Sequence, residues 1–311
     1  MRICSLLPSA TEIVFLLGLG DQLFGVSHEC DYPPEARGKR VLVRSVVEPA
    51  RLTSRQIDDM VAQHSASGQP LYLLDWEAFQ DIGPDLVLTQ SLCDVCAVPA
   101  RQVGQAVSVL LRAPEVLSLD PHTLEDVLQD ILRVGKATGT AARARSAIAA
   151  LRRRIQAVER RTRDVTERPR VVCLEWLDPP IVAGHWVPEM VELAGGRDVL
   201  ARPGSPSRRA AWDEVVEAQP EVLVLMPCGF DVARTLDEAR LLSALPGWAQ
   251  LPAVRGGRVW AANAHEYYSR PGPRLVDGLE FLAEMLHPEA FRGYIHPRAA
   301  APVLVGGLSP T

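Results

Sequence analysis

The chain has 311 residues, with 33 basic and 38 acidic side chains and a net charge of −5 at pH 7. A domain typically takes about 100–200 residues, so the length predicts two domains. The mild acidity excludes a dedicated nucleic-acid binder, which needs a basic face to neutralise phosphates. The hydrophobic fraction of 47% excludes disorder over most of the chain.

We predict neither a membrane span nor a secretory leader, taking Met1 as the natural start. Apolar stretches such as 13–20 and 299–308 are much shorter than the about 20 residues that a bilayer requires. Polar residues within 5–12 interrupt any leader-like apolar run. We therefore expect a cytoplasmic location, with the six cysteines present as reduced thiols or metal ligands.

Strands and helices alternate in the first 120 residues. Short apolar runs predict strands at 2–7, 23–27, 84–90 and 115–119. Periodic apolar positions predict helices at 13–18, 53–63 and 75–81, the first with Ser9 as its N-cap and Glu12 as the capping-box partner. This alternation predicts a mostly parallel sheet with helices on its faces.

A proline-free stretch follows, from Thr123 to about Arg163. Apolar residues recur in it at helical spacing, and Thr123 with Asp126 resembles a capping box. We predict one helix of roughly 40 residues within 121–166, about 60 Å long at 1.5 Å per residue. A helix of this length is expected to bridge two lobes.

The alternation returns after Pro169. Strands are predicted at 171–175, 221–226 and 258–262, and helices at 187–193, 213–218 and 272–286. Residues 84–88 and 220–224 share one pattern, a proline and an acid before a buried strand, which indicates two similar lobes. The predicted fold class is α/β. It has two Rossmann-like lobes with mostly parallel sheets at 1–120 and 167–287, one long backbone helix that joins them, a ligand cleft between them at the strand ends, and a loose tail at 288–311.

Two thiols three positions apart, Cys93 and Cys96, are the sharpest local chemical signal. They can chelate one metal ion or form a redox pair. Cys30 and His28 are candidates to complete four ligands, a set that suits zinc or an iron–sulfur cluster. The alternative is a turn with two partly buried thiols and no metal.

Polar and aromatic residues follow predicted strands in both lobes. Segment 28–32 combines His28 with acids and a tyrosine, which indicates a loop that faces a ligand. Trp176, His185 and Trp186 follow the first strand of the second lobe. Aromatic faces suit a large planar ligand, and a histidine can bind a metal centre that the ligand carries. The alternative is core packing against a neighbouring helix.

Tyr267 lies shortly before the last predicted helix, together with Arg270 and Arg274. The arginines and the helix N-terminus can hold an anionic group, or the arginines can form structural ion pairs. The sequence contains no G-x-G-x-x-G, Walker A or G-x-S-x-G motif, and we find no nucleophile paired with a base. These observations favour a binding protein over an enzyme.

Three segments carry a resemblance to a known family: Ser-Leu-Leu-Pro-Ser-Ala-Thr-Glu at 5–12, Asp-Tyr-Pro-Pro at 31–34, and residues 179–196. With two α/β lobes and one long helix, the chain resembles the class III periplasmic binding proteins. Over about residues 2–286 it is most similar to the vitamin B12-binding proteins of ABC importers. The resemblance implies that Tyr32 faces a corrinoid in the cleft and that Trp186 covers it.

The same resemblance implies one glutamate on each lobe that contacts arginines of the permease. Trp76-Glu77-Ala78-Phe79 matches the first position at Glu77, and Trp212-Asp213-Glu214-Val215 matches the second at Glu214. The alternative for both is a solvent-facing helix carboxylate.

Three functions are compatible with these observations. The first is a binding protein for cobalamin or a related corrinoid or metal chelate, which holds its ligand without chemistry and has an ABC permease as partner. The second is a cytoplasmic metal or iron–sulfur protein built on Cys30, Cys93, Cys96 and His28, with a redox role. The third is an enzyme that processes a corrinoid or tetrapyrrole. We rank them in this order, and none of them involves nucleic acid or membrane insertion.

Overall fold

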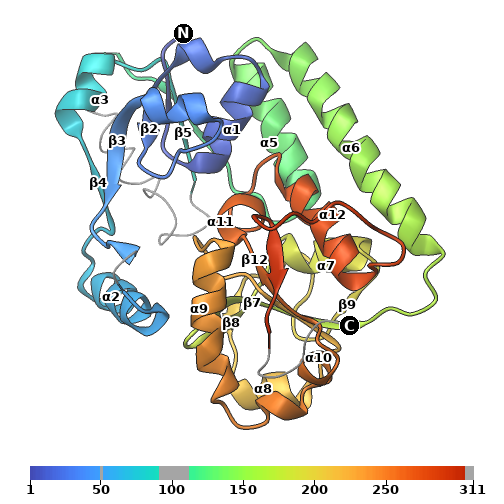
Figure 1. The fold of residues 1–311 in the computed structure, drawn as a ribbon. Helices are drawn as coiled ribbons and strands as arrows, with labels where there is room; N and C mark the ends of the chain where they lie inside the picture. The colour runs from blue at the N-terminus through green and yellow to red at the C-terminus, as the bar shows by residue number, and fades with distance from the viewer. Residues whose placement is uncertain (50–51, 91–111, 305–311) are drawn as a thin grey trace. The chain divides into compact units, whose positions relative to one another are not determined.

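A computed structural model describes residues 1–49, 52–90 and 112–304 (Figure 1). Contacts divide the chain into two compact units, each with its own sheet. Unit 1 comprises Met1–Leu52, Gln56–Pro121 and Glu125–Ala150, and unit 2 comprises Thr53–Arg55, His122–Leu124 and Leu151–Thr311. The predicted α/β class with two lobes is confirmed. No helix in the described ranges combines the length and the apolar character that a membrane crossing needs.

Unit 1 contains a six-stranded sheet in the order β4-β3-β2-β1-β5-β6. All neighbouring strands are parallel except β4, which is antiparallel to β3. The strands are β1 (Ile3–Ser5), β2 (Leu23–Ser27), β3 (Arg40–Ser45), β4 (Tyr72–Leu74), β5 (Leu86–Thr89) and β6 (Glu115–Ser118). β5 is buried at every position, as expected for a central parallel strand that is covered on both faces.

The first helices of the chain are α1 (Pro8–Leu16), α2 (Ser54–Ser67) and α3 (Trp76–Ile82). The predicted capping box of α1 is wrong, because Ser9 lies inside the helix, which begins at Pro8 without a side-chain cap. At α3, the Asp75 side chain accepts a hydrogen bond from the Ala78 amide at 2.9 Å. Phe79 of α3 is fully buried in the core of unit 1, so this short helix is fixed at one end by its cap and along one face by packing.

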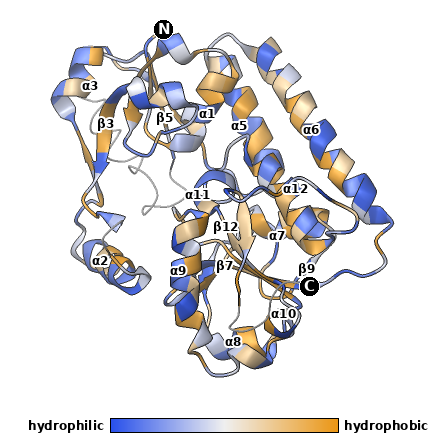
Figure 2. Ribbon diagram, viewed as in Figure 1, coloured by the Kyte–Doolittle hydropathy of each residue, from blue (hydrophilic) through white to orange (hydrophobic). Residues whose placement is uncertain are grey.

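Unit 2 contains a seven-stranded sheet in the order β10-β8-β7-β11-β12-β13, with β9 paired to β7. β9 and β11 pair with β7 in parallel, and β12 pairs with β11 in parallel. The antiparallel pairs are β8 with β7, β10 with β8, and β13 with β12. The strands are β7 (Arg170–Leu177), β8 (Pro180–Val182), β9 (Arg197–Asp198), β10 (Arg208–Arg209), β11 (Val222–Leu225), β12 (Val259–Ala262) and β13 (Ala300–Pro302). The helices are α7 (Val187–Leu193), α8 (Trp212–Glu217), α9 (Val232–Ser243), α10 (Pro252–Arg255), α11 (Ala264–Tyr267) and α12 (Leu275–Leu286). Figure 2 shows apolar residues along β7 and β12, where this core lies.

The two units repeat one local arrangement at their central strands. In unit 1 the Arg2 amide donates to the Asp85 carboxylate at 2.7 Å, and the Asp85 amide donates to the Arg2 carbonyl at 2.8 Å. In unit 2 the Arg170 amide donates to the Glu221 carboxylate at 2.8 Å, and the Glu221 amide returns a bond of 2.8 Å. Each acid precedes the strand that pairs with the first strand of its unit, so the structure contains the repeat that the sequence indicates.

The stretch predicted as one helix forms two, α5 (Leu124–Ala137) and α6 (Ala141–Arg163). The break falls at Thr138-Gly139-Thr140, where Gly139 has φ +71° and the Thr140 amide donates to the Gly135 carbonyl at 2.7 Å. A Cβ on Gly135 would lie 2.6 Å from the Ala144 Cβ, so the two helices pack closely beside this turn. α6 alone has 23 residues, which corresponds to about 35 Å.

Residues 288–304 are not the loose tail that the sequence suggests. Phe291 is fully buried, and β13 pairs with β12 along residues 300–302. The Glu284 carboxylate of α12 accepts hydrogen bonds from the Tyr294 and Ile295 amides at 2.7 and 2.8 Å. This segment lacks apolar periodicity because a turn and one short strand hold it, so the sequence pattern does not reveal its packing.

Asp130 is a buried carboxylate on α5, with a side chain that is 5% exposed. Its Oδ1 accepts a hydrogen bond from Arg133 at 2.7 Å, whereas its Oδ2 is buried without a hydrogen-bond partner. Burial raises the pKa of Asp130 to about 6; Arg133 opposes this shift, and Asp120 and Asp126 add to it. The charged form therefore destabilises the folded state at neutral pH.

Asp130→Asn is accordingly expected to raise the free energy of unfolding by about 1–3 kcal/mol at about pH 7.5. The folded-state pKa lies above the ordinary value of 3.8. The stability of the parent protein should therefore fall as the pH rises from about 4 to about 6, and the gain should vanish near pH 4. Urea unfolding of parent and variant at about pH 7.5 and about pH 4 measures the two free energies of unfolding. Asp237→Asn is the matched control, because Asp237 is exposed and has the same i,i+3 arginine partner. An equal gain at both pH values would contradict the assignment.

Candidate functional site

The carboxyl ends of β7, β11 and β12 meet at one edge of the unit 2 sheet, because these neighbouring strands are parallel. The Cys228 amide donates to the Glu175 carbonyl at 2.9 Å, and the His265 amide donates to the Phe230 carbonyl at 3.1 Å. These bonds join the three segments that follow the strands. Open α/β sheets bind ligands outside the carboxyl ends of their strands, so this edge is the candidate site of unit 2.

Trp176 and Phe230 form an aromatic pair at this edge. Their ring centroids are 5.3 Å apart, with the rings inclined by 58°. Phe230 is 2% exposed, and the Arg234 guanidinium lies 3.9 Å from its ring centroid. Trp176 is partly buried, and its Nε1 is buried without a hydrogen-bond partner. This aromatic pair, with a cation beside it, suits a planar ligand that carries acceptor or anionic groups.

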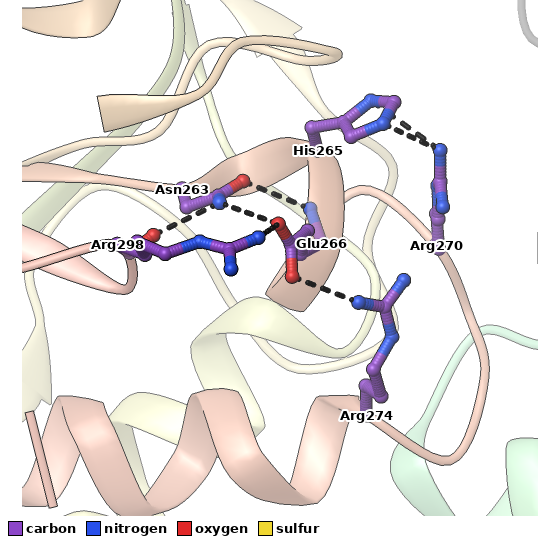
Figure 3. A network of polar contacts seen from close by, with 6 residues as sticks. All are labelled: Asn263, His265, Glu266, Arg270, Arg274 and Arg298. Carbon is purple, nitrogen blue, oxygen red and sulfur yellow. Dashed lines mark hydrogen bonds and ion pairs between the residues drawn. The ribbon is translucent and has the colours of Figure 1, made fainter. Parts of the chain in front are cut away.

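Glu266 is the centre of a polar network after β12 (Figure 3). Asn263 begins α11, with its Oδ1 accepting from the Glu266 amide at 3.1 Å and its Nδ2 donating to the Arg298 carbonyl at 2.9 Å. The Glu266 carboxylate accepts a hydrogen bond from Arg274 at 3.0 Å and lies 3.8 Å from the Arg298 guanidinium. Arg274 is 7% exposed, so its charge is held by a structural ion pair, the alternative that the sequence left open.

Arg270 is 6% exposed and faces the His265 ring (Figure 3). Its Nη2 lies 2.7 Å from Nε2 of His265. A guanidinium has no acceptor, so Nε2 accepts this hydrogen bond and the ring proton is assigned to Nδ1. The two arginines of this segment thus have different partners, a carboxylate for Arg274 and a ring nitrogen for Arg270.

The structure places two predicted ligand-binding aromatics in the interior of unit 2. Trp186 is 6% exposed, and its Nε1 donates to the Tyr268 carbonyl at 2.9 Å. Tyr267 is 9% exposed and packs edge-on against Phe281 at 4.9 Å, and burial raises its pKa to about 12. Both side chains act as core residues here, and neither is brought to the edge as an open aromatic surface.

Residues that the sequence interpretation missed complete this part of unit 2. Phe230 and Arg234 follow β11, and the signal that could have found them is the turn Pro-Cys-Gly-Phe-Asp after a buried strand. His122 was also missed: its ring centroid is 5.4 Å from that of His185, a predicted residue in the loop between β8 and α7. The two histidines are 63 positions apart in the sequence, so spacing does not reveal their contact.

In unit 1, the predicted ligand-facing loop follows β2. Tyr32 is 45% exposed. The His28 Nδ1 lies 3.1 Å from the Val43 carbonyl, which fixes the ring beside β3. Cys30 is 4% exposed, and its sulfur accepts a hydrogen bond from the Thr11 hydroxyl at 3.0 Å. The exposed aromatic of this loop is therefore Tyr32, and the thiol faces the interior.

The predicted cysteine cluster is only partly within the described residues. Cys93 and Cys96 lie outside them, so the Cys30, Cys93, Cys96 and His28 ligand set stays a prediction. Among residues 1–49, 52–90 and 112–304, no three His, Cys, Asp or Glu side chains form a group that could hold a metal ion.

The two predicted docking glutamates lie in the first turns of short helices. Glu77 is exposed on α3, one position after Trp76. Glu214 on α8 accepts from the Ala211 amide at 2.9 Å and pairs with Arg208 at 3.0 Å. The backbone hydrogen bond from Ala211 and the Arg208 guanidinium lower the pKa of Glu214. Glu214 therefore caps its own helix, whereas the exposed Asp213 occupies the place after Trp212 that Glu77 occupies after Trp76.

A sequence profile of periplasmic binding proteins matches residues 3–265. The chain belongs to the periplasmic binding protein family. The match covers most of the chain and confirms the resemblance that the sequence motifs indicate. As a member of this family, the chain is a binding protein of the periplasmic type.

Individual relatives match over nearly their whole length. A vitamin B12-binding protein of Vibrio cholerae is 27% identical over 283 residues, which is 90% of this chain and 86% of the relative. The uncharacterised ABC transporter substrate-binding lipoprotein YvrC of Bacillus subtilis is 24% identical over 294 residues, 94% of this chain and 81% of the relative. Because both chains are covered almost end to end, the similarity concerns the whole protein and not one lobe.

Solved structures have the same fold. The vitamin B12-binding protein BtuF of Vibrio cholerae superimposes with a TM-score of 0.67 at 23% identity, covering 94% of this chain and 98% of BtuF. The heme-binding protein RhuT of Roseiflexus gives a TM-score of 0.68 at 25% identity, covering 93% and 98% of the two chains. The fold is therefore shared by proteins with different ligands.

The expectation of a cytoplasmic location is wrong. The matched family consists of periplasmic binding proteins, and the Bacillus subtilis relative is a lipoprotein. The prediction that the cysteines are reduced because the protein is cytoplasmic has lost its basis.

Proposed function

We propose that the chain binds cobalamin or a closely related corrinoid and delivers it to an ABC permease without converting it chemically. The observation that carries the proposal is the similarity to vitamin B12-binding proteins over 90% of this chain and 86% of the relative.

The described residues support a large planar ligand. In unit 2, the partly buried Trp176 lies at the carboxyl edge of the sheet and packs against the buried Phe230, and Arg234 lies next to the Phe230 ring. The unpartnered Nε1 of Trp176 is a donor that a ligand acceptor would satisfy. In unit 1, Tyr32 is an exposed aromatic after β2. Large ligands with amide side chains use both kinds of contact, aromatic packing and single hydrogen bonds.

We propose that Tyr32 and Trp176 make the principal ligand contacts. His28 and His185 are proposed as polar neighbours of the ligand, because each lies in a loop that follows a strand. Trp186 and Tyr267 are proposed to support the site indirectly: their buried side chains pack against the ligand-binding loops and hold them in place.

For the permease we propose a pair of carboxylates, one in the first turn of α3 and one in the first turn of α8. Glu77 provides the first. On α8, Glu214 is the residue that the family resemblance implies, and Asp213 is the residue that the internal repeat aligns with Glu77. Carboxylates at helix N-termini are stabilised in their charged form, which suits ion pairs with arginines of a partner.

Heme is a second candidate ligand. RhuT binds heme and is 25% identical to this chain over 93% of its length. Heme carries two carboxylates, and the Arg234 guanidinium at the candidate site could pair with one of them. Cobalamin presents amides in place of these carboxylates, so the two ligands make different demands on this arginine.

Absorption spectroscopy separates the two ligands. The purified protein is mixed with cobalamin or with heme and passed through a desalting column. We expect corrinoid bands at about one equivalent per chain and no retained heme. Retained heme without retained corrinoid would replace the proposal by the second candidate, and retention of neither would exclude both.

A further inference from the structure

Two histidines from distant parts of the sequence meet in unit 2. His122 precedes α5, and His185 lies between β8 and α7. Their ring centroids are 5.4 Å apart, with the rings inclined by 46°. The His122 segment is fixed to unit 2 by the Leu124 amide, which donates to the Glu189 carboxylate of α7 at 2.8 Å. The approach of the two rings is thus built into the local structure.

The loop that carries His185 is held tightly. His185 has φ +54°, a left-handed conformation that a residue other than glycine rarely adopts. Its amide donates to the Ser205 carbonyl at 2.6 Å, and its carbonyl accepts from the Gly204 amide at 2.9 Å. A Cβ on Gly184 would lie 2.4 Å from the Ser207 amide nitrogen, so the backbone at Gly184 is in direct contact with the backbone at 205–207. Strained conformations that the surroundings enforce concentrate at functional sites.

The electronic state of His185 suits a metal ligand. Its Nδ1 is buried and has no hydrogen-bond partner, although buried polar atoms normally have one. Burial lowers the pKa of His185, and His122 lowers it further. A neutral imidazole with an unused nitrogen is a common ligand of Zn²⁺, Ni²⁺ and Cu²⁺.

We propose that His122 and His185 bind one divalent transition-metal ion of the Zn²⁺ class. With Zn–N bonds of about 2.0–2.1 Å and near-tetrahedral angles, two imidazole centroids on one ion lie roughly 5 Å apart, close to the arrangement seen here. No third His, Cys, Asp or Glu joins them in the part of the chain that the structure describes. The two imidazoles are thus the ligands that the described residues supply. The inference is independent of which tetrapyrrole the protein binds.

Isothermal titration calorimetry with ZnCl₂ tests this inference. The full chain is stripped of metal, and its accessible thiols are alkylated so that no thiolate contributes, because Cys228 is exposed. We expect one ion per chain at about pH 7.5, and an affinity at least about tenfold weaker in His122→Gln and in His185→Gln. His64→Gln on α2 is the matched control and should bind as the parent does.

Two results would overturn the inference: absence of zinc binding in the parent protein, or an unchanged affinity in His122→Gln. His122 is exposed, so its replacement does not threaten folding, and the test stands even if His185→Gln fails to fold. Electron paramagnetic resonance of the Cu²⁺-loaded parent gives a second readout. Coupling to two imidazole nitrogens is expected, and coupling to none would count against the site.

Discussion

Trp176→Ala is expected to weaken cobalamin binding by about tenfold or more, which corresponds to at least about 1.4 kcal/mol. The variant removes one ring of the aromatic pair and the indole N–H that has no partner within the described protein. Aromatic contacts contribute about 0.5–1.5 kcal/mol beyond the apolar area that they bury, and a lost hydrogen bond adds about 1 kcal/mol. Calorimetric titration of parent and variant measures the change.

Trp212→Ala is the matched control for this experiment. Trp212 is also a partly buried tryptophan of unit 2, and it stacks on Trp248 at 6.1 Å. It begins α8, which precedes β11, so it lies at the opposite end of that strand from Phe230. The control should lose stability but not affinity. Equal affinities of Trp176→Ala and the parent for cobalamin would remove Trp176 from the proposed site.

Glu77→Arg is expected to lower cobalamin import by more than about tenfold while the affinity of the purified protein for its ligand stays unchanged. Charge reversal replaces an attraction to a permease arginine by a repulsion, and close charge pairs across interfaces contribute about 1.5–7 kcal/mol in the best-measured cases. Glu77 is exposed, so the variant should fold as the parent does. Uptake of labelled cobalamin into cells or vesicles with the cognate permease measures the effect.

The corresponding experiment on α8 distinguishes two neighbouring acids. Glu214→Gln removes the charge but leaves an oxygen that can accept from the Ala211 amide, so the helix cap is retained. Asp213→Asn removes the charge of an exposed side chain. A loss of import in only one variant identifies the docking residue. Normal import in Glu77→Arg and in both α8 variants would contradict the proposed docking surface.

The alternation of strands and helices could be predicted because its signals are local. The apolar runs at 86–88 in β5 and 222–225 in β11 indicate central parallel strands, and the proline and acid before each run reveal the repeat. α9 was missed because its buried face consists of Val232, Thr235, Ala239 and Leu242, where two of four residues are polar or small. The apolar period is therefore weak although the helix is well packed.

The division between α5 and α6 shows how much one turn changes a prediction. Apolar periodicity continues on both sides of Thr138-Gly139-Thr140, and Figure 2 shows hydrophobic and hydrophilic residues along both helices. Gly139 can be accommodated in a continuous helix at a modest cost, so its presence does not decide the matter. The close packing of Gly135 against Ala144 is a tertiary contact, and it determines where the chain turns.

The candidate site was less predictable because the direction of a side chain depends on the whole fold. Trp176 lies near the end of β7, and Trp186 lies ten positions later, just before α7. The indole of Trp186 is buried and donates a hydrogen bond to the Tyr268 carbonyl. Arg270 and Arg274 lie just before the N-terminus of α12, where arginines can hold an anion. Glu266, eight positions before Arg274, already neutralises that arginine. The sequence pattern does not reveal which side chains of these loops face outward.

Calorimetric titration of the purified full chain with cyanocobalamin tests the central proposal most directly. We predict one corrinoid per chain with a dissociation constant of about 1 μM or lower. This corresponds to a binding free energy of about −8 kcal/mol or a more negative value. Absence of saturable binding at ligand concentrations about a hundredfold above this value would contradict the assignment of cobalamin as the ligand.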